Sequence, residues 1–220
     1  MTSITIQESQ LRITEIFYSL QGESNTVGLP TVFVRLTGCP LRCQYCDTAY
    51  AFSGGKMMTL EMIIAEVLQY NCAYVCVTGG EPLAQPACLP LLQALCDKNL
   101  NVSLETSGAR DITLVDKRVV VVMDLKTPDS TEMSKNRLEN IPLLKKTDQI
   151  KFVLCSRGDY EWACDMIKLH QLTSYAHILF SPSATQLNPT TLANWILEDR
   201  LPVRFQLQLH KILWHDMPGH

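Results

Sequence analysis

The stretch Thr31-Val-Phe-Val-Arg-Leu-Thr-Gly-Cys-Pro-Leu-Arg-Cys-Gln-Tyr-Cys46 joins a strand pattern to a group of cysteines. Its first six residues, 31–36, are mostly apolar or β-branched, which favours a buried β-strand. Cys39, Cys43 and Cys46 follow, with three residues in the first gap and two in the second. This order predicts a strand whose C-terminal end carries three thiols on one short loop, called the cysteine loop below.

Short apolar runs alternate with helical periodicity along the rest of the chain. Several of the runs are separated by stretches in which apolar residues recur at the helical period. Capping signals such as Thr59 and the pair Asn188-Pro189 mark where some of these helices begin. Runs that are apolar throughout predict parallel strands covered on both faces. The predicted strands are 31–36, 73–78, 102–105, 119–125, 149–154, 177–180 and 203–209, and the predicted helices are 60–68, 87–97, 162–172 and 188–196.

Seven strands with about four helices are too few for an eight-fold barrel, which typically needs ~250 residues. Residues 106–118 and 128–148 lack a clear helical pattern, and the chain has no internal repeat or linker. The sequence therefore predicts one α/β domain over residues 1–220. Its expected architecture is an incomplete, open barrel, similar to part of a TIM barrel, with a mostly parallel sheet.

The composition argues against several classes of protein. The chain has 220 residues, of which 46% are hydrophobic and 19% charged, so it can bury a substantial core. Its 19 basic and 22 acidic residues give a net charge of −3, which does not favour binding to nucleic acid. No apolar run approaches the ~18 residues of a membrane span, and residues 1–8 lack the pattern of a secretory signal. We therefore expect a cytoplasmic protein without nucleic-acid or membrane partners.

Unusual residues follow the predicted strands at the ends where ligands bind in parallel sheets. The segments concerned are the cysteine loop, Gly79-Gly80-Glu81, Glu105-Thr106-Ser107-Gly108, Asp124-Leu125-Lys126 and Ser181-Pro182. Because the carboxyl ends of parallel strands meet at one edge, these segments are expected to share one rim. The sequence predicts an active site there.

Nine cysteines in a chain without a recognisable export signal are expected to stay reduced rather than to pair. Six of them lie in apolar stretches and are expected to pack as small hydrophobic residues. Cys39, Cys43 and Cys46 can hold an iron–sulfur cluster on three thiolates and leave one iron without a protein ligand. Zinc is the alternative, but a structural zinc site takes four protein ligands, and no fourth Cys or His follows at short spacing.

The cysteine loop resembles the signature of the radical S-adenosylmethionine (SAM) superfamily, which has this spacing and an aromatic residue, here Tyr45, before the third cysteine. Thr78-Gly79-Gly80-Glu81-Pro82 resembles the glycine-rich motif of the same superfamily. The resemblance implies a 4Fe–4S cluster whose open iron binds the amino and carboxylate groups of SAM. It also implies that one electron, from an external flavodoxin-like donor, splits the sulfonium and yields a 5′-deoxyadenosyl radical.

Residues outside these two motifs indicate one family within the superfamily. The chain resembles the 7-carboxy-7-deazaguanine synthase family from about residue 11 to residue 211. The resemblance is carried by Ser19-Leu-Gln-Gly-Glu-Ser24, Arg35, Asp47-Thr48 and Gln208-Leu-His-Lys211. The serine at position 24, where the family usually has glycine, and the tail after position 211 depart from the pattern. The resemblance implies a homodimeric, Mg²⁺-dependent lyase of queuosine biosynthesis. Its expected reaction converts 6-carboxy-5,6,7,8-tetrahydropterin to 7-carboxy-7-deazaguanine with loss of ammonia.

Candidate site residues follow from this resemblance, position by position. The cluster ligands are the three cysteines, and Thr48 matches the family's Mg²⁺ ligand. The residues that match substrate contacts are Leu20, Gln21, Gly22, Glu23, Arg35, Thr78 and His210. The residues that match SAM contacts are Gly79, Gly80, Glu81, Ser107, Asp124, Leu125, Lys126, Ser181, Pro182, Ser183 and Ala184.

Ordinary structural roles stay open for several of these residues. Arg35 can be a surface residue of its strand, Thr48 can cap a helix, and Lys126 and Lys151 can be solvated at strand ends. Two other functions also stay open. A glycyl-radical activating enzyme has the same cysteine loop but acts on a protein, whereas a non-enzymatic iron–sulfur carrier would use a fourth ligand and would not need the glycine-rich motif.

Overall fold

The central strands are largely buried, but only the face that packs against the helices is apolar, because Thr78, Asp124 and Lys151 on the other face line a cavity. In β4 (Tyr74–Gly79), β7 (Gln149–Leu154) and β8 (His177–Pro182), most residues are buried. The computed structural model describes residues 9–215, 217 and 219, and it places these strands in a nine-stranded sheet. The other strands are β1 (Gln10–Leu20), β2 (Pro30–Leu36), β3 (Lys56–Thr59), β5 (Asn101–Thr106), β6 (Val120–Asp124) and β9 (Arg204–Phe205).

The sheet follows the order of the chain apart from β3. Its order is β3-β1-β2-β4-β5-β6-β7-β8-β9, and every neighbouring pair from β2 to β9 is parallel. β1 pairs antiparallel with both β2 and β3. Because β3 and β9 form the two edges, the sheet does not close. This arrangement confirms the predicted open, partial barrel with a mostly parallel sheet.

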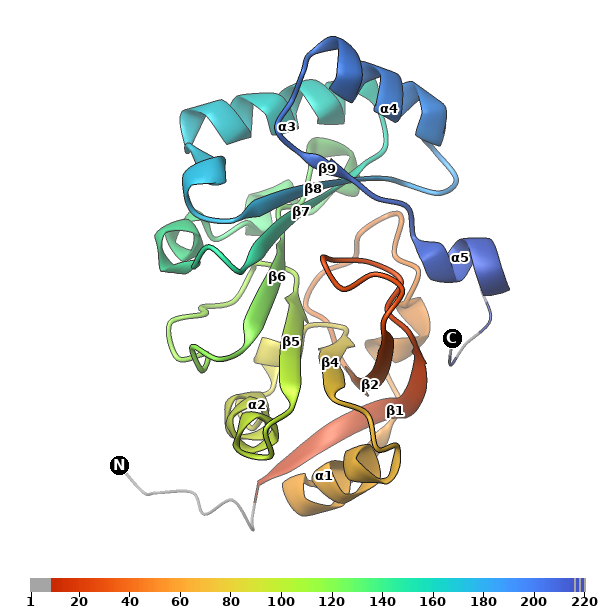
Figure 1. Ribbon diagram of the computed structural model, residues 1–220, viewed down its shortest axis with the longest axis vertical. Helices are drawn as coiled ribbons and strands as arrows, with labels where there is room; N and C mark the ends of the chain where they lie inside the picture. The colour runs from red at the N-terminus through yellow and green to blue at the C-terminus, as the bar shows by residue number, and fades with distance from the viewer. Residues whose placement is uncertain (1–8, 216, 218, 220) are drawn as a thin grey trace.

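Helices lie between several of the parallel strands, and side chains cap three of them. Thr59, Ser156 and Asn188 accept hydrogen bonds from backbone N–H groups in the first turns of α1, α3 and α4. Figure 1 shows α1 and α2 near one end of the curved sheet and α3 and α4 near the other. The helices are α1 (Leu60–Gln69), α2 (Cys88–Asp97), α3 (Arg157–Leu169), α4 (Pro189–Glu198) and α5 (Leu209–Trp214).

The buried apolar residues form two clusters that correspond to these two groups of helices. One cluster joins α1 and α2 to β1, β2, β4 and β5. The other joins α3 and α4 to β6, β7 and β8. The helix α5 belongs to neither cluster, and the N–H of Leu209 at its start donates to the carbonyl oxygen of Gly22 in the loop after β1 (3.0 Å). Its position is therefore set by contacts with that loop.

The sequence prediction is wrong at both ends of the sheet. Residues 31–36 do not form the first strand, because β1 precedes them and β3 adds a further strand. Many residues of β1 are only partly buried, so it lacks the continuous apolar run that marks the other strands. The predicted strand 203–209 is also too long, because β9 ends at Phe205 and Leu209 begins α5. Residues 128–148 contain short 3₁₀ helices, which agrees with their lack of a helical pattern.

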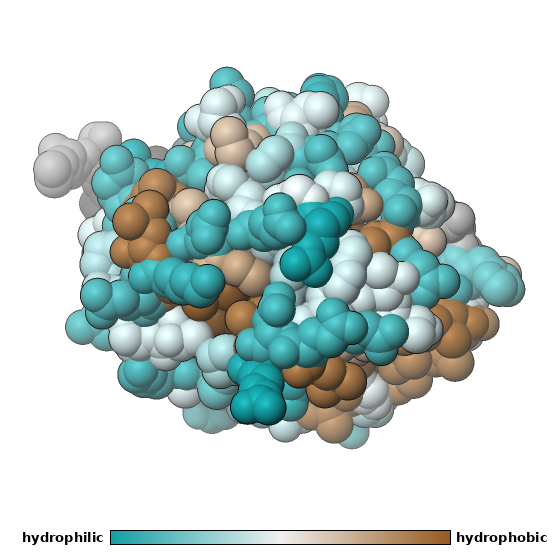
Figure 2. All heavy atoms as spheres, turned by 90° about the horizontal axis from the view of Figure 1, so that it is seen from above, coloured by the Kyte–Doolittle hydropathy of each residue, from teal (hydrophilic) through white to brown (hydrophobic). Residues whose placement is uncertain are grey.

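Among the described residues, no helix has both the length and the apolar character needed to cross a membrane. Residues 1–8, in which the sequence shows no export signal, lie outside the described residues. Seen from above Figure 1, the surface is largely hydrophilic or neutral, with apolar groups in separate patches (Figure 2). Exposed apolar side chains such as Leu169 and Leu197 are usual on protein surfaces.

Candidate active site

A cavity of about 580 Å³ lies inside the curved sheet and reaches the C-terminal ends of its parallel strands. Its size is within the range of ligand pockets, ~300–1,000 Å³. The cysteine loop, the loop after β1, several strand ends and the C-terminal segment all line it. The predicted site residues that do not line it are Glu81, Leu125, Ser181 and Pro182. The structure therefore brings all the other predicted residues to one cavity.

The cysteine loop is held against the segment that follows β6. The N–H of Arg42 donates to the carboxylate of Glu132 (2.5 Å), and the N–H of Gln44 donates to the carbonyl oxygen of Ser130 (3.3 Å). The three thiols are partly exposed and line the cavity. Burial raises the pKa of each thiol, and the positive charge of Lys126 opposes this effect in all three cases.

The glycine-rich segment after β4 lies against the start of the cysteine loop without room for a side chain. Gly79 has a φ of +128°, a conformation that favours glycine. A Cβ atom on Gly80 would lie 2.1 Å from the carbonyl oxygen of Gly38. That carbonyl oxygen also accepts a hydrogen bond from the N–H of Glu81 (2.9 Å). The ends of β2 and β4 are thus in direct backbone contact beside the thiols.

Glu81 is fully buried and joins the glycine-rich segment to the end of β5. Its carboxylate accepts hydrogen bonds from the hydroxyls of Thr106 and Ser107 and from the N–H of Ser107 (2.7 Å). It also accepts the N–H of Leu83 (2.9 Å). Glu81 does not line the cavity, but it is placed to position Ser107, which does.

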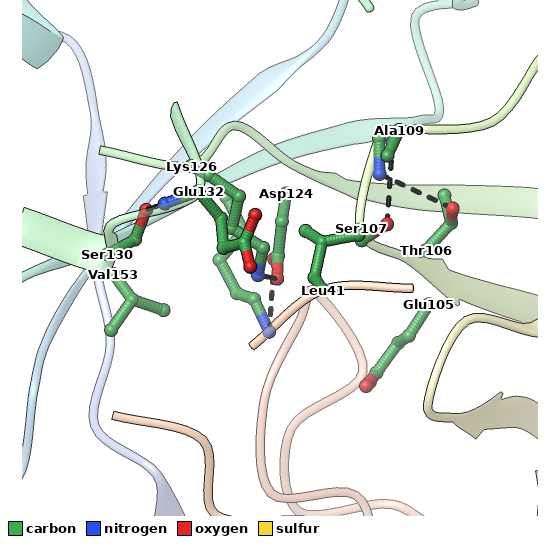
Figure 3. A network of polar contacts seen from close by, with 12 residues as sticks. Leu41, Glu105, Thr106, Ser107, Ala109, Asp124, Lys126, Ser130, Glu132 and Val153 are labelled. Carbon is green, nitrogen blue, oxygen red and sulfur yellow. Dashed lines mark hydrogen bonds and ion pairs between the residues drawn. The ribbon is translucent and has the colours of Figure 1, made fainter. Parts of the chain in front are cut away.

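Four buried or partly buried charged side chains, called the charge cluster below, connect the loop after β1 to β6 and β7. The Nζ atom of Lys151 lies 2.7 Å from Glu23 and 3.4 Å from Asp124, and the Nζ atom of Lys126 lies 2.5 Å from Asp124. Figure 3 shows the contact between Asp124 and Lys126. Both lysines are 8% exposed, so neither is a solvated strand-end residue.

Within the charge cluster, the pKa values of the two lysines and of Asp124 shift in opposite directions. Burial opposes the charge of Lys126 and Lys151, but the carboxylates beside them raise the pKa of both ammonium groups above the ordinary value. Burial would also raise the pKa of Asp124, but the two lysines hold the pKa of this carboxyl below its usual range. Asp124, Lys126 and Lys151 are therefore charged at neutral pH.

One carboxylate oxygen of the charge cluster lacks a partner. Oε2 of Glu23 accepts the hydrogen bond from Lys151, but Oε1 is buried and has no hydrogen-bond partner among the residues that the structure describes. A buried oxygen of this kind is unfavourable unless a donor reaches it. Because Glu23 lines the cavity, a ligand with an N–H or O–H group can supply that donor.

Glu105 is an acidic residue of the cavity wall that the candidate list from the sequence omits. It stands near the end of β5 and accepts a hydrogen bond from the hydroxyl of Thr78 (3.2 Å). Burial raises the pKa of Glu105, Lys151 opposes this shift, and the negative charges of Glu23 and Asp124 add to it. The sequence places Glu105 on the rim but gives no sign that its carboxyl lies partly buried among other charges.

Arg35 lies in the cavity wall and is not a surface residue. Its side chain is 15% exposed, and its Nε donates to the carboxylate of Glu15 on β1 (2.7 Å). The Cζ atom lies 5.5 Å from the ring centre of Phe17 and 5.8 Å from that of Tyr50. Burial opposes the charge of the guanidinium, but Tyr50 and Glu15 outweigh burial and raise the pKa of Arg35.

The C-terminal segment lines the cavity and is anchored beside the third cysteine. Gln208 donates to the carboxylate of Asp47 (3.1 Å), and the Nζ atom of Lys211 lies 3.5 Å from the same group. The imidazole of His210 fills the space that a Cβ atom on Gly22 would need. Burial lowers the pKa of His210. The predicted histidine therefore lies beside the predicted loop after β1.

Thr48 stands at the N-terminal end of the 3₁₀ helix Ala49–Phe52 but does not cap it with its side chain. Its hydroxyl instead donates to the carboxylate of Asp47 (2.8 Å). Because Thr48 lines the cavity, the lone pairs of its oxygen are available to a ligand there.

Comparison with known proteins identifies the family. A model described as the radical SAM superfamily matches residues 33–169. The 7-carboxy-7-deazaguanine synthase of Chlorobaculum tepidum is 46% identical over 211 residues, which cover 94% of this chain and 96% of that protein. The chain belongs to the 7-carboxy-7-deazaguanine synthase family of the radical SAM superfamily.

Other comparisons agree with this membership. The 7-carboxy-7-deazaguanine synthase of Thermoplasma acidophilum is 35% identical over 209 residues, which cover 94% of this chain and 99% of that protein. The crystal structure of QueE from Escherichia coli has the same fold, with a TM-score of 0.76 and 22% identity, and it covers 91% of this chain and 95% of that chain. The family excludes the two alternatives, a glycyl-radical activating enzyme and an iron–sulfur carrier.

Radical SAM enzymes use a 4Fe–4S cluster and SAM, and the cavity fits these groups. Three thiols of one loop line it, together with Gly79 and Gly80 of the adjacent glycine-rich segment. Among the described residues, no three His, Cys, Asp or Glu side chains are arranged to hold a single metal ion. The thiols of this radical SAM protein are thus not arranged as a mononuclear zinc site, whose ligands converge tetrahedrally on one ion.

The contact between Gly80 and Gly38 predicts that adding one methyl group at Gly80 destabilises the fold. We expect Gly80→Ala to lower the free energy of unfolding of the cluster-free protein by about 1–3 kcal/mol, because its Cβ would overlap backbone that cannot move freely. Gly158→Ala is the matched control, because its Cβ has room and α3 gains a better helix former, so it is expected to stabilise by up to ~1 kcal/mol. Urea unfolding of both variants measures the difference, and equal effects would contradict the close contact.

The raised pKa of Glu105 predicts that this residue lowers stability at neutral pH. Since the folded-state pKa lies above the unfolded one, the proton's contribution to stability is complete below the unfolded pKa and is lost as the pH rises through the folded pKa. The side chain of a Glu105→Gln variant does not titrate, so the variant avoids this loss. As the pH rises from acidic to neutral, we expect its free energy of unfolding to increase by on the order of 1 kcal/mol relative to that of the wild type. Urea unfolding across this range tests it, with the exposed Glu139→Gln as control. A constant difference between Glu105→Gln and the wild type would show that Glu105 does not titrate as described.

Proposed function

We propose that this enzyme converts 6-carboxy-5,6,7,8-tetrahydropterin to 7-carboxy-7-deazaguanine and ammonia. The atoms of the substrate equal those of the two products, so the reaction consumes no external oxidant. The observation that carries the proposal is Oε1 of Glu23, which accepts no hydrogen bond from the described part of the chain, in a cavity that also holds Arg35. A pterin carboxylate has N–H donors on its pyrimidine edge and an anionic group for a guanidinium.

Cys39, Cys43 and Cys46 would hold the cluster, and the strand ends would receive SAM. When bound, the cluster and SAM supply a carbon-centred radical that abstracts a hydrogen atom from C6 of the substrate. Gly79 and Gly80 line the cavity beside the thiols and are proposed to contact the methionine end of SAM. The remaining residues proposed for SAM are Glu81, Ser107, Asp124, Leu125, Lys126, Ser181, Pro182, Ser183 and Ala184, of which Glu81 acts by positioning Ser107.

The substrate-binding residues are proposed to orient the pterin from two sides. Arg35 presents a cationic fork to the carboxylate, since only its Nε is engaged by Glu15. Glu23, fixed by Lys151, accepts hydrogen bonds from the pyrimidine edge. Thr78 and His210 complete the contacts, together with the segment Leu20–Gly22. Two opposed anchors of this kind would hold C6 in one position relative to SAM.

Thr48 is proposed to bind Mg²⁺ together with substrate oxygens and water. Magnesium prefers hard oxygen ligands in octahedral geometry and often takes only one or two from the protein. The hydroxyl of Thr48 is such a ligand, and it lines the cavity without capping the helix. The charge of the ion would stabilise the anionic substrate during ring contraction.

The partners of the reaction belong to the same proposal. An external one-electron donor, of the flavodoxin-like class, would reduce the cluster. We also propose a homodimer and a cytoplasmic location, which follow from the family and from the sequence.

Product analysis tests the proposed reaction. The protein, reconstituted anaerobically with iron and sulfide, is expected to form 7-carboxy-7-deazaguanine from the pterin when SAM, Mg²⁺ and a reductant are present. Cys43→Ala should lose both the cluster absorbance and turnover, whereas Cys72→Ala, outside the cavity, should keep both. Turnover by a cluster-bound Cys43→Ala protein would contradict the three-ligand assignment.

Magnesium titration tests the proposed role of Thr48. The wild-type rate is expected to rise with added Mg²⁺, and Thr48→Ala should reduce this response because the hard oxygen ligand is lost. Thr59→Ala is the control: it removes the capping hydroxyl of α1, lowers stability by ~1 kcal/mol and should leave the Mg²⁺ response intact. If wild type and Thr48→Ala are both indifferent to Mg²⁺, the metal has no role at this position.

A further inference from the structure

A β-bulge in β1 controls which side chains face the cavity. Ile13 pairs with Leu36, but Glu15 pairs with Arg35, so two steps along β1 match one step along β2. Without the bulge, Ile13 and Glu15 would point to the same face of the sheet, because side chains alternate along a strand. With the bulge, Ile13 stays in the apolar core with Leu36, while Glu15 lies beside Arg35.

Glu15 joins the strand to the segment after the cysteine loop. Its Oε1 atom accepts hydrogen bonds from the Nε of Arg35 and from the hydroxyl of Tyr50, both at 2.7 Å. Tyr50 also places its ring near the guanidinium, and Phe17 lies near it as well. The guanidinium is therefore fixed at one nitrogen and flanked by two rings.

The two terminal nitrogens of Arg35 have no hydrogen-bond partner among the described residues, and Arg35 lines the cavity. Glu15 does not line the cavity, so it can influence a ligand only through other residues. A guanidinium fork binds a carboxylate with two parallel hydrogen bonds only when its plane has the right orientation. The plane of Arg35 is set by Glu15, Tyr50 and Phe17.

We propose that Glu15 and Tyr50 are positioning residues that fix the Arg35 guanidinium so that its free edge receives the carboxylate of the substrate. This inference rests on the proposed function, in which Arg35 binds that carboxylate. Holding the side chain in advance reduces the conformational entropy lost on binding. Substitutions of Glu15 or Tyr50 should therefore weaken binding of the substrate carboxylate and leave binding of the pterin ring unchanged.

Two probes that differ only in the carboxylate separate these contributions. Pterin-6-carboxylic acid and pterin are both fluorescent, and their binding to the anaerobically reconstituted protein can be measured by titration. We expect Glu15→Gln to weaken binding of the carboxylic acid by about tenfold and to change binding of pterin by less than twofold. We expect Tyr50→Phe, which keeps the ring, to weaken binding of pterin-6-carboxylic acid by about threefold. In steady-state assays, KM for the substrate should rise more than kcat falls.

Control variants remove the same groups elsewhere. Tyr18→Phe removes a hydroxyl from the exposed side of β1, and Glu61→Gln removes an exposed charge from α1, so both should bind the two probes as the wild type does. In an Arg35→Met background, Glu15→Gln should cause no further loss of selectivity for the carboxylic acid. Equal weakening of both probes by Glu15→Gln, or no weakening by either variant, would overturn the positioning role.

The same measurements distinguish failure of the inference from failure of the proposed function. If the wild type binds both probes equally, or if Arg35→Met leaves the preference for the carboxylic acid unchanged, Arg35 is not the carboxylate site, and the inference falls with it. If Arg35→Met removes the preference but Glu15→Gln does not reduce it, the carboxylate site stands and only the positioning role is wrong.

Discussion

The ion pairs of Lys151 with Glu23 and Asp124 are the interaction on which the shape of the cavity depends. Glu23 and Lys151 are 128 residues apart in sequence, so their contact ties the loop after β1 to β7, and Asp124 extends the connection to β6. Removing one partner from a buried ion pair generally destabilises a protein by ~3–5 kcal/mol, because it leaves an unpaired charge. The side chains around the ligand space are thus fixed by charge pairing before any ligand binds.

The same cavity contains groups that weaken the fold. Glu105 is partly buried near other carboxylates, and Oε1 of Glu23 has no donor within the described ranges of the chain. An apolar core would avoid both features, since buried polar atoms without partners are unfavourable. Their concentration around one space is typical of a binding site, where a ligand supplies the missing hydrogen bonds and stability is given up for function.

The sequence predicts the parallel part of the fold and most of the cavity lining, because both have local signals. Short, largely apolar runs mark the parallel strands β2, β4 and β6 to β8, and the cysteine spacing marks the loop that decides the family. The signal fails where tertiary contacts decide: β1 has many partly buried residues, and α5 is held through the contact of Leu209 with Gly22. Glu15 and Glu105 are charged residues within strands, and nothing local shows that the fold partly buries them.

The loop after β1 explains how a barrel that lacks strands can still enclose a ligand. A complete barrel fills its interior with layers of side chains, whereas this sheet stays open at β3 and β9. The loop spans the interior instead: the N–H of Ser24 donates to Gln206 (3.0 Å), and the N–H of Asn25 donates to Gln149 (2.7 Å). The turn needs a φ of +69° at Ser24, which accounts for the family's usual glycine there. The serine compensates in part, because its hydroxyl bonds to Thr26 (2.9 Å), so the loop keeps its path and Glu23 keeps its place in the cavity.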